Sequence, residues 1–239
     1  MATVIPHLLS SDASAGDRVQ GGAARLLVLL HGWSADEHDM AGLGRRLDPD
    51  GTWLVVAPRG PVVVGRDRYA WFARDADDEI EPASLRAGLD AVDELIDELC
   101  AARHLDRAKA VVGGFSQGAA TALVLARRPS PRPRPAGVLC LSGFLAAVDA
   151  PDLGLDGEGA ADVAVLVQHG TDDDVVPALL GRAVARLCQR TGTPVVHEEH
   201  PMGHETSDAS RAAAAGWLAA IAAGDRPDRR GSVTADGTP

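Results

Sequence analysis

The residues best suited to covalent chemistry form the run Gly114-Phe115-Ser116-Gln117-Gly118, which has the pattern Gly-x-Ser-x-Gly. An apolar run precedes it and a helical pattern begins at Gln117. A serine on a sharp strand-to-helix turn exposes its hydroxyl above the sheet, and small neighbours allow the strained backbone and the close packing. The N–H of Gln117, at a helix N-terminus, is suited to bind an oxyanion. The run predicts a nucleophilic Ser116; the alternative is a glycine-rich loop with a capping serine.

A second motif, His31-Gly32-Trp33-Ser34, follows the apolar run at 26–30. A His-Gly turn there would place a backbone N–H, that of Trp33, opposite the N–H of Gln117. Two such donors form the oxyanion hole of acyl-transfer enzymes. The same residues also fit an ordinary turn at the end of a strand. We interpret the His31 side chain as structural.

Three adjacent aspartates, Asp172, Asp173 and Asp174, follow a late apolar run at 163–168 and the pair His169-Gly170. A carboxylate in a loop after a late strand is suited to orient the histidine of a catalytic triad. The residue types alone leave open which aspartate has this role. A helix N-cap and a cation site are the alternatives for this cluster.

Of the eight histidines, His204 is the best placed to reach over the serine. It lies between the last predicted strand and the last predicted helix, and it completes the order Ser, Asp, His along the chain. His197, His200 and His204 also invite a metal-site interpretation. In an extended strand, however, residues three apart point to opposite faces, and prolines flank the first two histidines. We therefore expect no metal and no cofactor.

The elements that must position these side chains alternate along the chain. Nearly continuous apolar runs, typical of strands buried on both faces, lie at 26–30, 53–57, 110–113, 137–141, 163–168 and 194–197. A shorter run at 3–9 indicates an N-terminal edge strand. Helical patterns lie at 85–99, 117–126, 178–189 and 207–222. The alternation predicts an α/β fold, with a mostly parallel sheet between two layers of helices and its ligand at the carboxyl ends of the strands.

The length of 239 residues fits one domain and leaves no room for a separate lid domain. We expect this domain to span residues 1–224. Residues 225–239 have no apolar periodicity, which predicts a disordered C-terminal tail.

Composition and charge exclude several classes of function. A content of 46% hydrophobic and 24% charged residues is that of a globular protein, and a net charge of −11 argues against a nucleic-acid partner. No apolar run is long enough to cross a bilayer, so we expect no stable membrane insertion. The N-terminus lacks the features of a signal peptide, and three cysteines without paired spacing indicate reduced thiols. These features predict a cytoplasmic protein.

Aromatic side chains are few, namely four Trp, three Phe and one Tyr. Six of them lie in or beside segments that follow predicted strands, at the edge where a ligand would bind. We expect Trp71, Phe72 and Phe144 to line an apolar substrate pocket beside Ser116. Ordinary core packing is the alternative.

Together, these segments resemble the phospholipase/carboxylesterase family of α/β-hydrolases, which includes bacterial carboxylesterases and acyl-protein thioesterases. The matching segments run in the family's order over about residues 23–222, and they are 29–32, 57–60, 69–72, 114–118, 141–144, 169–177 and 201–205.

The resemblance implies the α/β-hydrolase fold and a role for each matched position. Ser116 would be the nucleophile and His204 the general base. Asp173 would be the acid, since its distances from His169-Gly170 and from Val176-Pro177 match the family's spacing. The backbone N–H groups of Trp33 and Gln117 would form the oxyanion hole.

We therefore expect a serine hydrolase of broad specificity that cleaves carboxylic esters or thioesters with a short or medium acyl group through an acyl-enzyme. Its partner would be a small-molecule ester or acyl substrate, and the protein would be a monomer or a homodimer. The alternatives are a non-catalytic small-molecule-binding protein of the same fold, and a serine peptidase or acyltransferase on the same scaffold.

Overall fold

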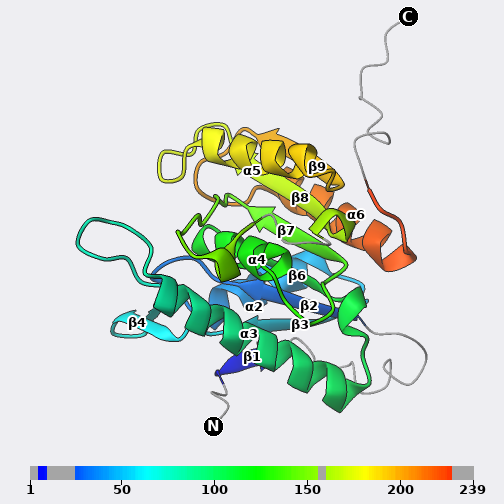
Figure 1. Ribbon diagram of the computed structural model, residues 1–239. Coiled ribbons are helices and arrows are strands. Elements are labelled where there is room, and N and C mark those ends of the chain that lie inside the picture. The colour runs from blue at the N-terminus through cyan, green and yellow to red at the C-terminus, as the bar shows by residue number, and fades with distance from the viewer. Residues whose placement is uncertain (1–4, 10–24, 156–159, 228–239) are drawn as a thin grey trace, which may run out of the picture.

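The centre of the molecule is a sheet of seven strands, seen in a computed structural model that describes residues 5–9, 25–155 and 160–227 (Figure 1). In spatial order the strands are β1 (His7–Leu9), β3 (Trp53–Pro58), β2 (Arg25–Leu30), β6 (Val111–Phe115), β7 (Gly137–Leu141), β8 (Ala164–Gly170) and β9 (Val195–His200). The edge strand β1 is antiparallel to β3, and all other pairs are parallel. The predicted α/β fold with a mostly parallel sheet is confirmed.

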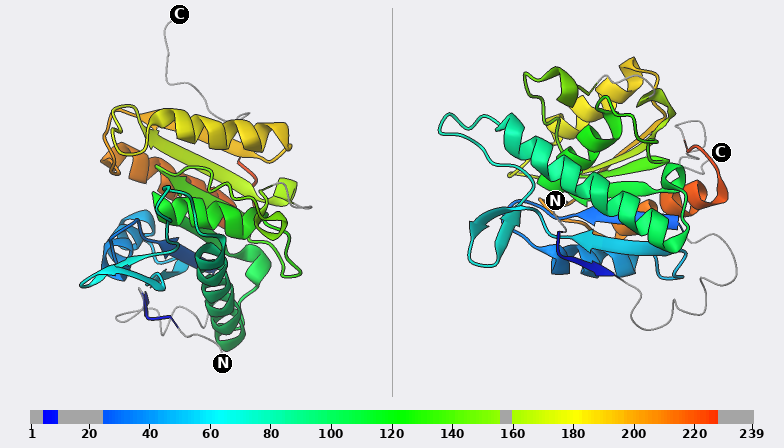
Figure 2. Two further views of the ribbon diagram at one scale, coloured as in Figure 1. Left: turned by 60° about the vertical axis from the view of Figure 1, so that its left-hand side comes forward. Right: turned by 60° about the horizontal axis from the view of Figure 1, so that its bottom comes forward.

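Helices cover both faces of this sheet (Figures 1 and 2). One face packs against α2 (Glu37–Leu47) and α6 (Asp208–Ala223), and the other against α3 (Pro82–Arg103), α4 (Gln117–Arg127) and α5 (Ala178–Arg190). Short 3-10 helices follow α3 and β7, namely η2 (Arg107–Lys109), η3 (Pro151–Leu153) and η4 (Ala160–Asp162). The three-layer arrangement explains why the strands are apolar at nearly every position.

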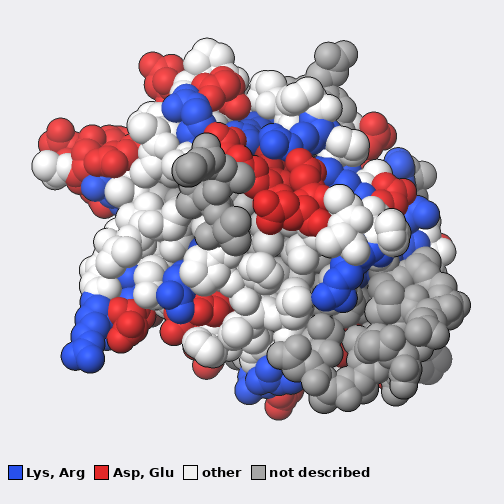
Figure 3. All heavy atoms as spheres, turned by 90° about the horizontal axis from the view of Figure 1, so that it is seen from below, with Lys and Arg blue, Asp and Glu red and all other residues white. Residues whose placement is uncertain are grey.

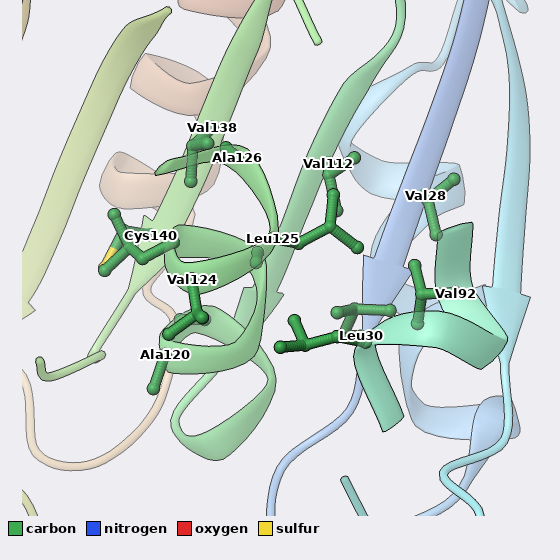
Figure 4. Close-up of a cluster of buried hydrophobic side chains, with 14 of the residues drawn as sticks. Val28, Leu30, Val92, Val112, Ala120, Val124, Leu125, Ala126, Val138 and Cys140 are labelled. Carbon is green, nitrogen blue, oxygen red and sulfur yellow. The ribbon is translucent and has the colours of Figure 1, made fainter. Parts of the chain in front are cut away.

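Strand β2 illustrates this double burial. Leu27 and Leu29 belong to the core on the α2 and α6 side, whereas Val28 and Leu30 belong to the core on the α3, α4 and α5 side. Figure 4 shows Val28 and Leu30 beside Val92 of α3 in the second core. Because successive strand residues point to opposite faces, a strand between two helical layers must be apolar throughout.

Two structural features in the N-terminal half, a helix and a short hairpin, were not predicted from the sequence. Helix α2 contains two glycines, which weaken the helical pattern, although Asp36 caps its N-terminus and Met40 and Leu43 are buried. The hairpin of β4 (Val62–Gly65) and β5 (Arg68–Ala70) is a separate two-stranded sheet. Its strands are too short to give a pattern of their own.

The strands that carry the site extend further than the apolar runs indicate. β8 includes His169 and Gly170, which lie beyond the apolar run that predicted this strand, and β9 continues to His200. The parallel ladder continues through these polar residues, with Gly170 paired to His200. Backbone hydrogen bonds to a neighbouring strand do not depend on side-chain polarity, so the apolar run ended before the strand did.

The termini and the surface bear on several other expectations. The domain boundary at residue 224 stays a prediction: α6 ends at Ala223, and residues 228–239 lie outside the described part. No helix among the described residues could span a membrane. All three cysteines are buried and free of disulfides. On the face shown in Figure 3, acidic and basic side chains are interspersed, and no continuous basic area is visible among the coloured atoms.

Candidate active site

Ser116 lies on a strained turn between β6 and α4. Its backbone φ is 53° and its ψ is −117°, a conformation that costs a non-glycine residue free energy and is typical of functional sites. The flanking glycines make the turn possible. A Cβ atom on Gly114 would lie 2.5 Å from the carbonyl oxygen of Leu30, and one on Gly118 only 2.1 Å from the same oxygen. Both glycines of the motif are therefore required by packing, which is the close approach expected of a nucleophile turn.

The loop at residues 31–35 lies directly beside this turn. A Cβ atom on Gly32 would be 3.6 Å from Cβ of Ser116, since β2 and β6 are adjacent and Leu30 at the end of β2 is in register with Gly114. Hydrogen bonds tie the loop to Tyr69, with the N–H of Ser34 donating to its carbonyl oxygen. Gln117 is the first residue of α4, so its N–H is one of the groups that a helix leaves without an intrahelical acceptor.

His31 holds this loop from within. Its side chain is fully buried, Nδ1 lies 2.8 Å from the carbonyl oxygen of Gly32, and Nε2 accepts a hydrogen bond of 2.9 Å from the N–H of Gly60. Because Nε2 accepts, the ring is neutral with its proton on Nδ1. Burial lowers the pKa of His31, which favours this neutral form. The expectation of a structural role for the His31 side chain agrees with these contacts.

We expect the free energy of unfolding to fall as the pH drops below roughly 6.5, where an unperturbed histidine takes up a proton. The unfolded chain then binds a proton that His31 in the folded protein does not, because its folded pKa is lowered. Below that pH, stability should decrease by up to about 1.4 kcal/mol per pH unit until the folded protein is protonated too.

Urea titrations between pH 8 and 5 of wild type and His31→Asn measure this effect. The variant lacks the titrating group, so its stability should depend less steeply on pH in that window. Equal slopes for the two proteins would contradict a stability role for neutral His31.

The side chain of Gln117 also has a structural function that the sequence pattern did not predict. Its Oε1 accepts a hydrogen bond of 2.8 Å from the N–H of Trp71, and its Nε2 donates to the carbonyl oxygen of Phe72 at 2.9 Å. The segment after β5 is thereby fixed to the start of α4. The residue whose backbone N–H is a predicted oxyanion donor is therefore bonded through its side chain to the segment at Trp71 and Phe72.

Asp173 and His204 meet beyond the carboxyl ends of β8 and β9. Nδ1 of His204 donates to Oδ2 of Asp173 at 2.8 Å. Oδ1 of Asp173 accepts from the N–H groups of Val175 and Val176 at 3.0 and 2.7 Å. Burial alone would raise the pKa of Asp173, but the hydrogen bonds from His204 and from the backbone outweigh it and lower that pKa. The carboxylate is therefore ionised at neutral pH.

The other two aspartates of the cluster face solvent. Asp172 and Asp174 are exposed, whereas the side chain of Asp173 is fully buried. The N–H groups of Thr171 and Asp172 donate to the carbonyl oxygens of His200 and Met202, which ties the loop after β8 to the loop after β9. This pairing of loops brings one aspartate, Asp173, against His204.

The ring of His204 packs against the ring of Phe115, the residue directly before Ser116. The centroids of the two rings are 4.6 Å apart, with the ring planes tilted by 50°. Since Nδ1 of His204 donates to Asp173, its Nε2 carries the lone pair that can accept a proton. The ring of Phe115 is thus the surface against which the imidazole rests.

Ser116 and Trp33 line two cavities. The larger, of about 760 Å³, also contains His204, and its other walls include Phe115, Met40, Leu43 and Val175. The smaller, of about 390 Å³, is lined by Phe72, Phe144, Arg74, Asp78 and Gln117 in addition to Ser116 and Trp33. Trp33 is 49% exposed and stands between the two.

The aromatic residues predicted to line the pocket thus divide into two groups. Phe72 and Phe144 border the smaller cavity, but Trp71 borders neither, so the expectation for Trp71 is wrong. Its side chain is fully buried and its Nε1 donates to the carbonyl oxygen of His31 at 2.9 Å. Trp71 therefore braces the loop that carries Trp33, and Trp33 is the tryptophan at the cavities.

In the part of the chain that the structure describes, the three histidines considered for a metal site do not belong to a cluster of metal ligands. Among the described residues there is no group of three or more His, Cys, Asp or Glu side chains that could hold a metal ion. His197 and His200 lie on β9, with their Nε2 atoms 3.6 Å from Glu199 and 3.4 Å from Glu198 respectively.

Comparison with known proteins gives consistent matches. The model of the phospholipase/carboxylesterase family matches residues 18–221. The crystal structure of the esterase PE8 is 26% identical, covers 92% of this chain and 100% of its own, and superposes with a TM-score of 0.71. The carboxylesterase of Bacillus cereus has a TM-score of 0.74 at 20% identity, over 91% of this chain and 94% of its own, which shows a common fold.

A curated protein matches over a shorter stretch. MhqD of Bacillus subtilis (strain 168) is 33% identical over 101 residues, which are 42% of this chain and 48% of that protein. The match thus spans about half the length of this curated relative.

Proposed function

Because the chain belongs to the phospholipase/carboxylesterase family and is an esterase-type hydrolase, we propose that it cleaves carboxylic esters or thioesters through an acyl-enzyme on Ser116. The observation that carries the proposal is the 2.8 Å hydrogen bond from His204 to Asp173, with His204 and Ser116 in the walls of one cavity. This arrangement leaves Nε2 of His204 available as the general base for the serine hydroxyl.

In the proposed first step, Oγ of Ser116 attacks the acyl carbonyl carbon while Nε2 of His204 takes its proton. Asp173 keeps the imidazole in the productive tautomer and stabilises the imidazolium that forms. The negative charge that develops on the carbonyl oxygen is bound by the N–H groups of Trp33 and Gln117, and losing one such donor costs about 3 to 4 kcal/mol of transition-state stabilisation.

The position of His204 assigns the two halves of the substrate to the two cavities. The imidazolium must return its proton to the oxygen or sulfur of the leaving group, so the leaving group has to lie within its reach. His204 borders the larger cavity and not the smaller one. The alcohol or thiol therefore occupies the larger cavity, and the acyl group occupies the smaller cavity between Phe72 and Phe144.

Hydrolysis then completes the cycle. After the leaving group departs, a water molecule enters from its side, and His204 takes a proton from it as it attacks the acyl carbon. The second tetrahedral intermediate collapses to the free acid, and the proton returns to Ser116. The small volume of the acyl cavity supports short or medium acyl groups as substrates.

A p-nitrophenyl ester series from acetate to decanoate, run beside acyl-CoA and acylated-peptide assays, tests this function. We expect turnover of the shorter esters, with kcat/KM falling at the longer ones. Cleavage of peptide bonds but not esters would favour the peptidase alternative. Absence of turnover together with measurable ester binding would favour a non-catalytic binding protein.

We expect Phe144→Ala to shift the enzyme toward longer acyl groups. Removal of this ring enlarges the smaller cavity, and each additional methylene that is buried contributes about 0.8 kcal/mol. The ratio of kcat/KM for p-nitrophenyl octanoate to that for butyrate should rise about tenfold, with the nitrophenolate leaving group held constant.

Leu43→Ala is the matched control, because Leu43 is a large apolar residue in the wall of the other cavity. Its acyl-length ratio should stay within about twofold of wild type, while its preference among alcohol groups of butyrate esters should change. If Leu43→Ala changed the acyl-length ratio and Phe144→Ala changed the preference among alcohol groups, the acyl group would have to be assigned to the larger cavity and the leaving group to the smaller one.

A further inference from the structure

A second buried histidine, His169, lies behind the Asp173–His204 pair. It is fully buried near the end of β8, four residues before Asp173. Its Nε2 is 2.7 Å from the carbonyl oxygen of Val176 and 3.4 Å from Oδ2 of Asp173. Neither of these contacts takes part in the proposed hydrolysis.

The hydrogen bonds of Val176 connect His169 to the proposed triad acid. The N–H of Val176 donates to Oδ1 of Asp173, and its carbonyl oxygen is the partner of His169. Because a carbonyl oxygen only accepts, Nε2 of His169 carries a proton and donates it. His169 thus holds the carbonyl oxygen of the same residue whose N–H orients the Asp173 carboxylate.

Helix α5 fixes the position of the imidazole from the opposite side. A Cβ atom on Gly181 would lie 2.4 Å from Nδ1 of His169 and 3.0 Å from its Cγ, so only glycine fits there. Nδ1 has no hydrogen-bond partner among the described residues. Glu199, which is paired in register with His169 on β9, is bound by Arg182 at 2.6 Å. The donor bond to Val176 is therefore the shorter of the two polar contacts of this ring, and the other is the 3.4 Å approach of Nε2 to Oδ2 of Asp173.

We propose that His169 is a positioning residue for the proposed triad acid: it fixes the turn at 173–176 so that Asp173 points at Nδ1 of His204. The inference rests on the proposed function of Asp173 and His204 and adds a residue that does not touch the substrate. Small displacements of catalytic groups lower rates strongly, by about a hundredfold for 1 Å. Loss of the donor at His169 should therefore reduce kcat while substrate binding is retained.

Two substitutions at His169 separate the donor from the bulk of the ring. His169→Phe keeps a planar ring but removes the donor, and we expect kcat for p-nitrophenyl acetate to fall about a hundredfold, with KM within about twofold. His169→Gln retains an N–H donor near the position of Nε2 and should stay within about fivefold of wild type. The acid limb of the kcat/KM–pH profile should move to lower pH in His169→Phe but not in His169→Gln, because a misplaced Asp173 stabilises the imidazolium of His204 less.

Gly181→Ala disturbs His169 without altering it. The added methyl group must displace the imidazole, so this variant should show the same fall in kcat and the same shift of the pH profile as His169→Phe. Gly216→Ala is the matched control, because Gly216 lies within helix α6 and its added Cβ would meet no atom within 4 Å. Its kinetics should be those of wild type.

The proposal is overturned if His169→Phe and Gly181→Ala have lower melting temperatures but wild-type kcat and pH profiles at 20 °C. It is also overturned if His169→Gln loses as much activity as His169→Phe, since the donor would then not be the relevant feature. Failure of the underlying function would look different, because Ser116→Ala would then retain the activity of wild type.

Discussion

Replacement of Ser116 by alanine is expected to lower kcat for p-nitrophenyl esters about a millionfold. The residual rate would come from substrate binding and the oxyanion hole alone. When a triad acts as a unit, removal of its nucleophile costs about as much as removal of all three members. Ser116 has the geometry for this effect, with a strained backbone at the end of β6 and its side chain in the wall shared by both cavities. Alanine accepts the same backbone conformation as serine, so the melting temperature should change little.

Labelling by a fluorophosphonate probe tests the reactivity of Ser116 without a substrate. It should label wild type and spare Ser116→Ala. Ser142→Ala is the matched control, because Ser142 also lies at the end of a sheet strand with a positive φ of 47°, but is buried. This control should be labelled as wild type is. Equal labelling of Ser116→Ala and wild type would exclude Ser116 as the nucleophile.

Replacement of Asp173 by asparagine is expected to lower kcat by about a thousandfold at near-native stability. The amide oxygen can still accept the N–H groups of Val175 and Val176, so the turn should persist. The amide nitrogen would face Nδ1 of His204, and a donor there favours the tautomer whose proton is on Nε2. That tautomer cannot take a proton from Ser116, and the corresponding substitution in a well-studied protease costs about ten-thousandfold.

The neighbouring aspartates provide the control. Asp172→Asn and Asp174→Asn alter exposed side chains and should keep kcat within about tenfold of wild type. If one of them proved to be the inactive variant and Asp173→Asn remained active, the acid would have to be reassigned to that residue. Stopped-flow measurement of the acyl-enzyme burst shows whether acylation is the step that slows.

The strands, the serine turn and the chain order of the candidate residues were predictable because each depends on local sequence. A buried parallel strand is a nearly continuous apolar run, and the turn at Ser116 needs small residues on both sides. The packing at Gly114 and Gly118 agrees with that reading, since neither position has room for a Cβ. Helix α2 was within reach as well, because Asp36 is an N-cap and Met40, Leu43 and Leu47 recur at helical spacing.

Residue type and spacing could not distinguish features that depend on contacts between distant segments. Trp71 and Trp33 are the same residue type, each near the end of an element, yet one is fully buried and the other is 49% exposed at the cavities. Trp71 is held by hydrogen bonds to the Gln117 side chain and to the carbonyl oxygen of His31, whereas Trp33 lines the two cavities. Packing of this kind is set by tertiary neighbours and has no signature in the local pattern.

The sequence by itself determined an α/β scaffold with a serine, an aspartate cluster and a histidine in hydrolase order. The family's spacing implied Asp173, but tertiary structure is what buries that carboxylate against His204 and places a second histidine behind it. The physical reason is that three adjacent aspartates are chemically identical along the chain. Only the pairing of the loops after β8 and β9 buries one of them, and a carboxylate is buried as an ion only where hydrogen bonds to its charge outweigh its desolvation.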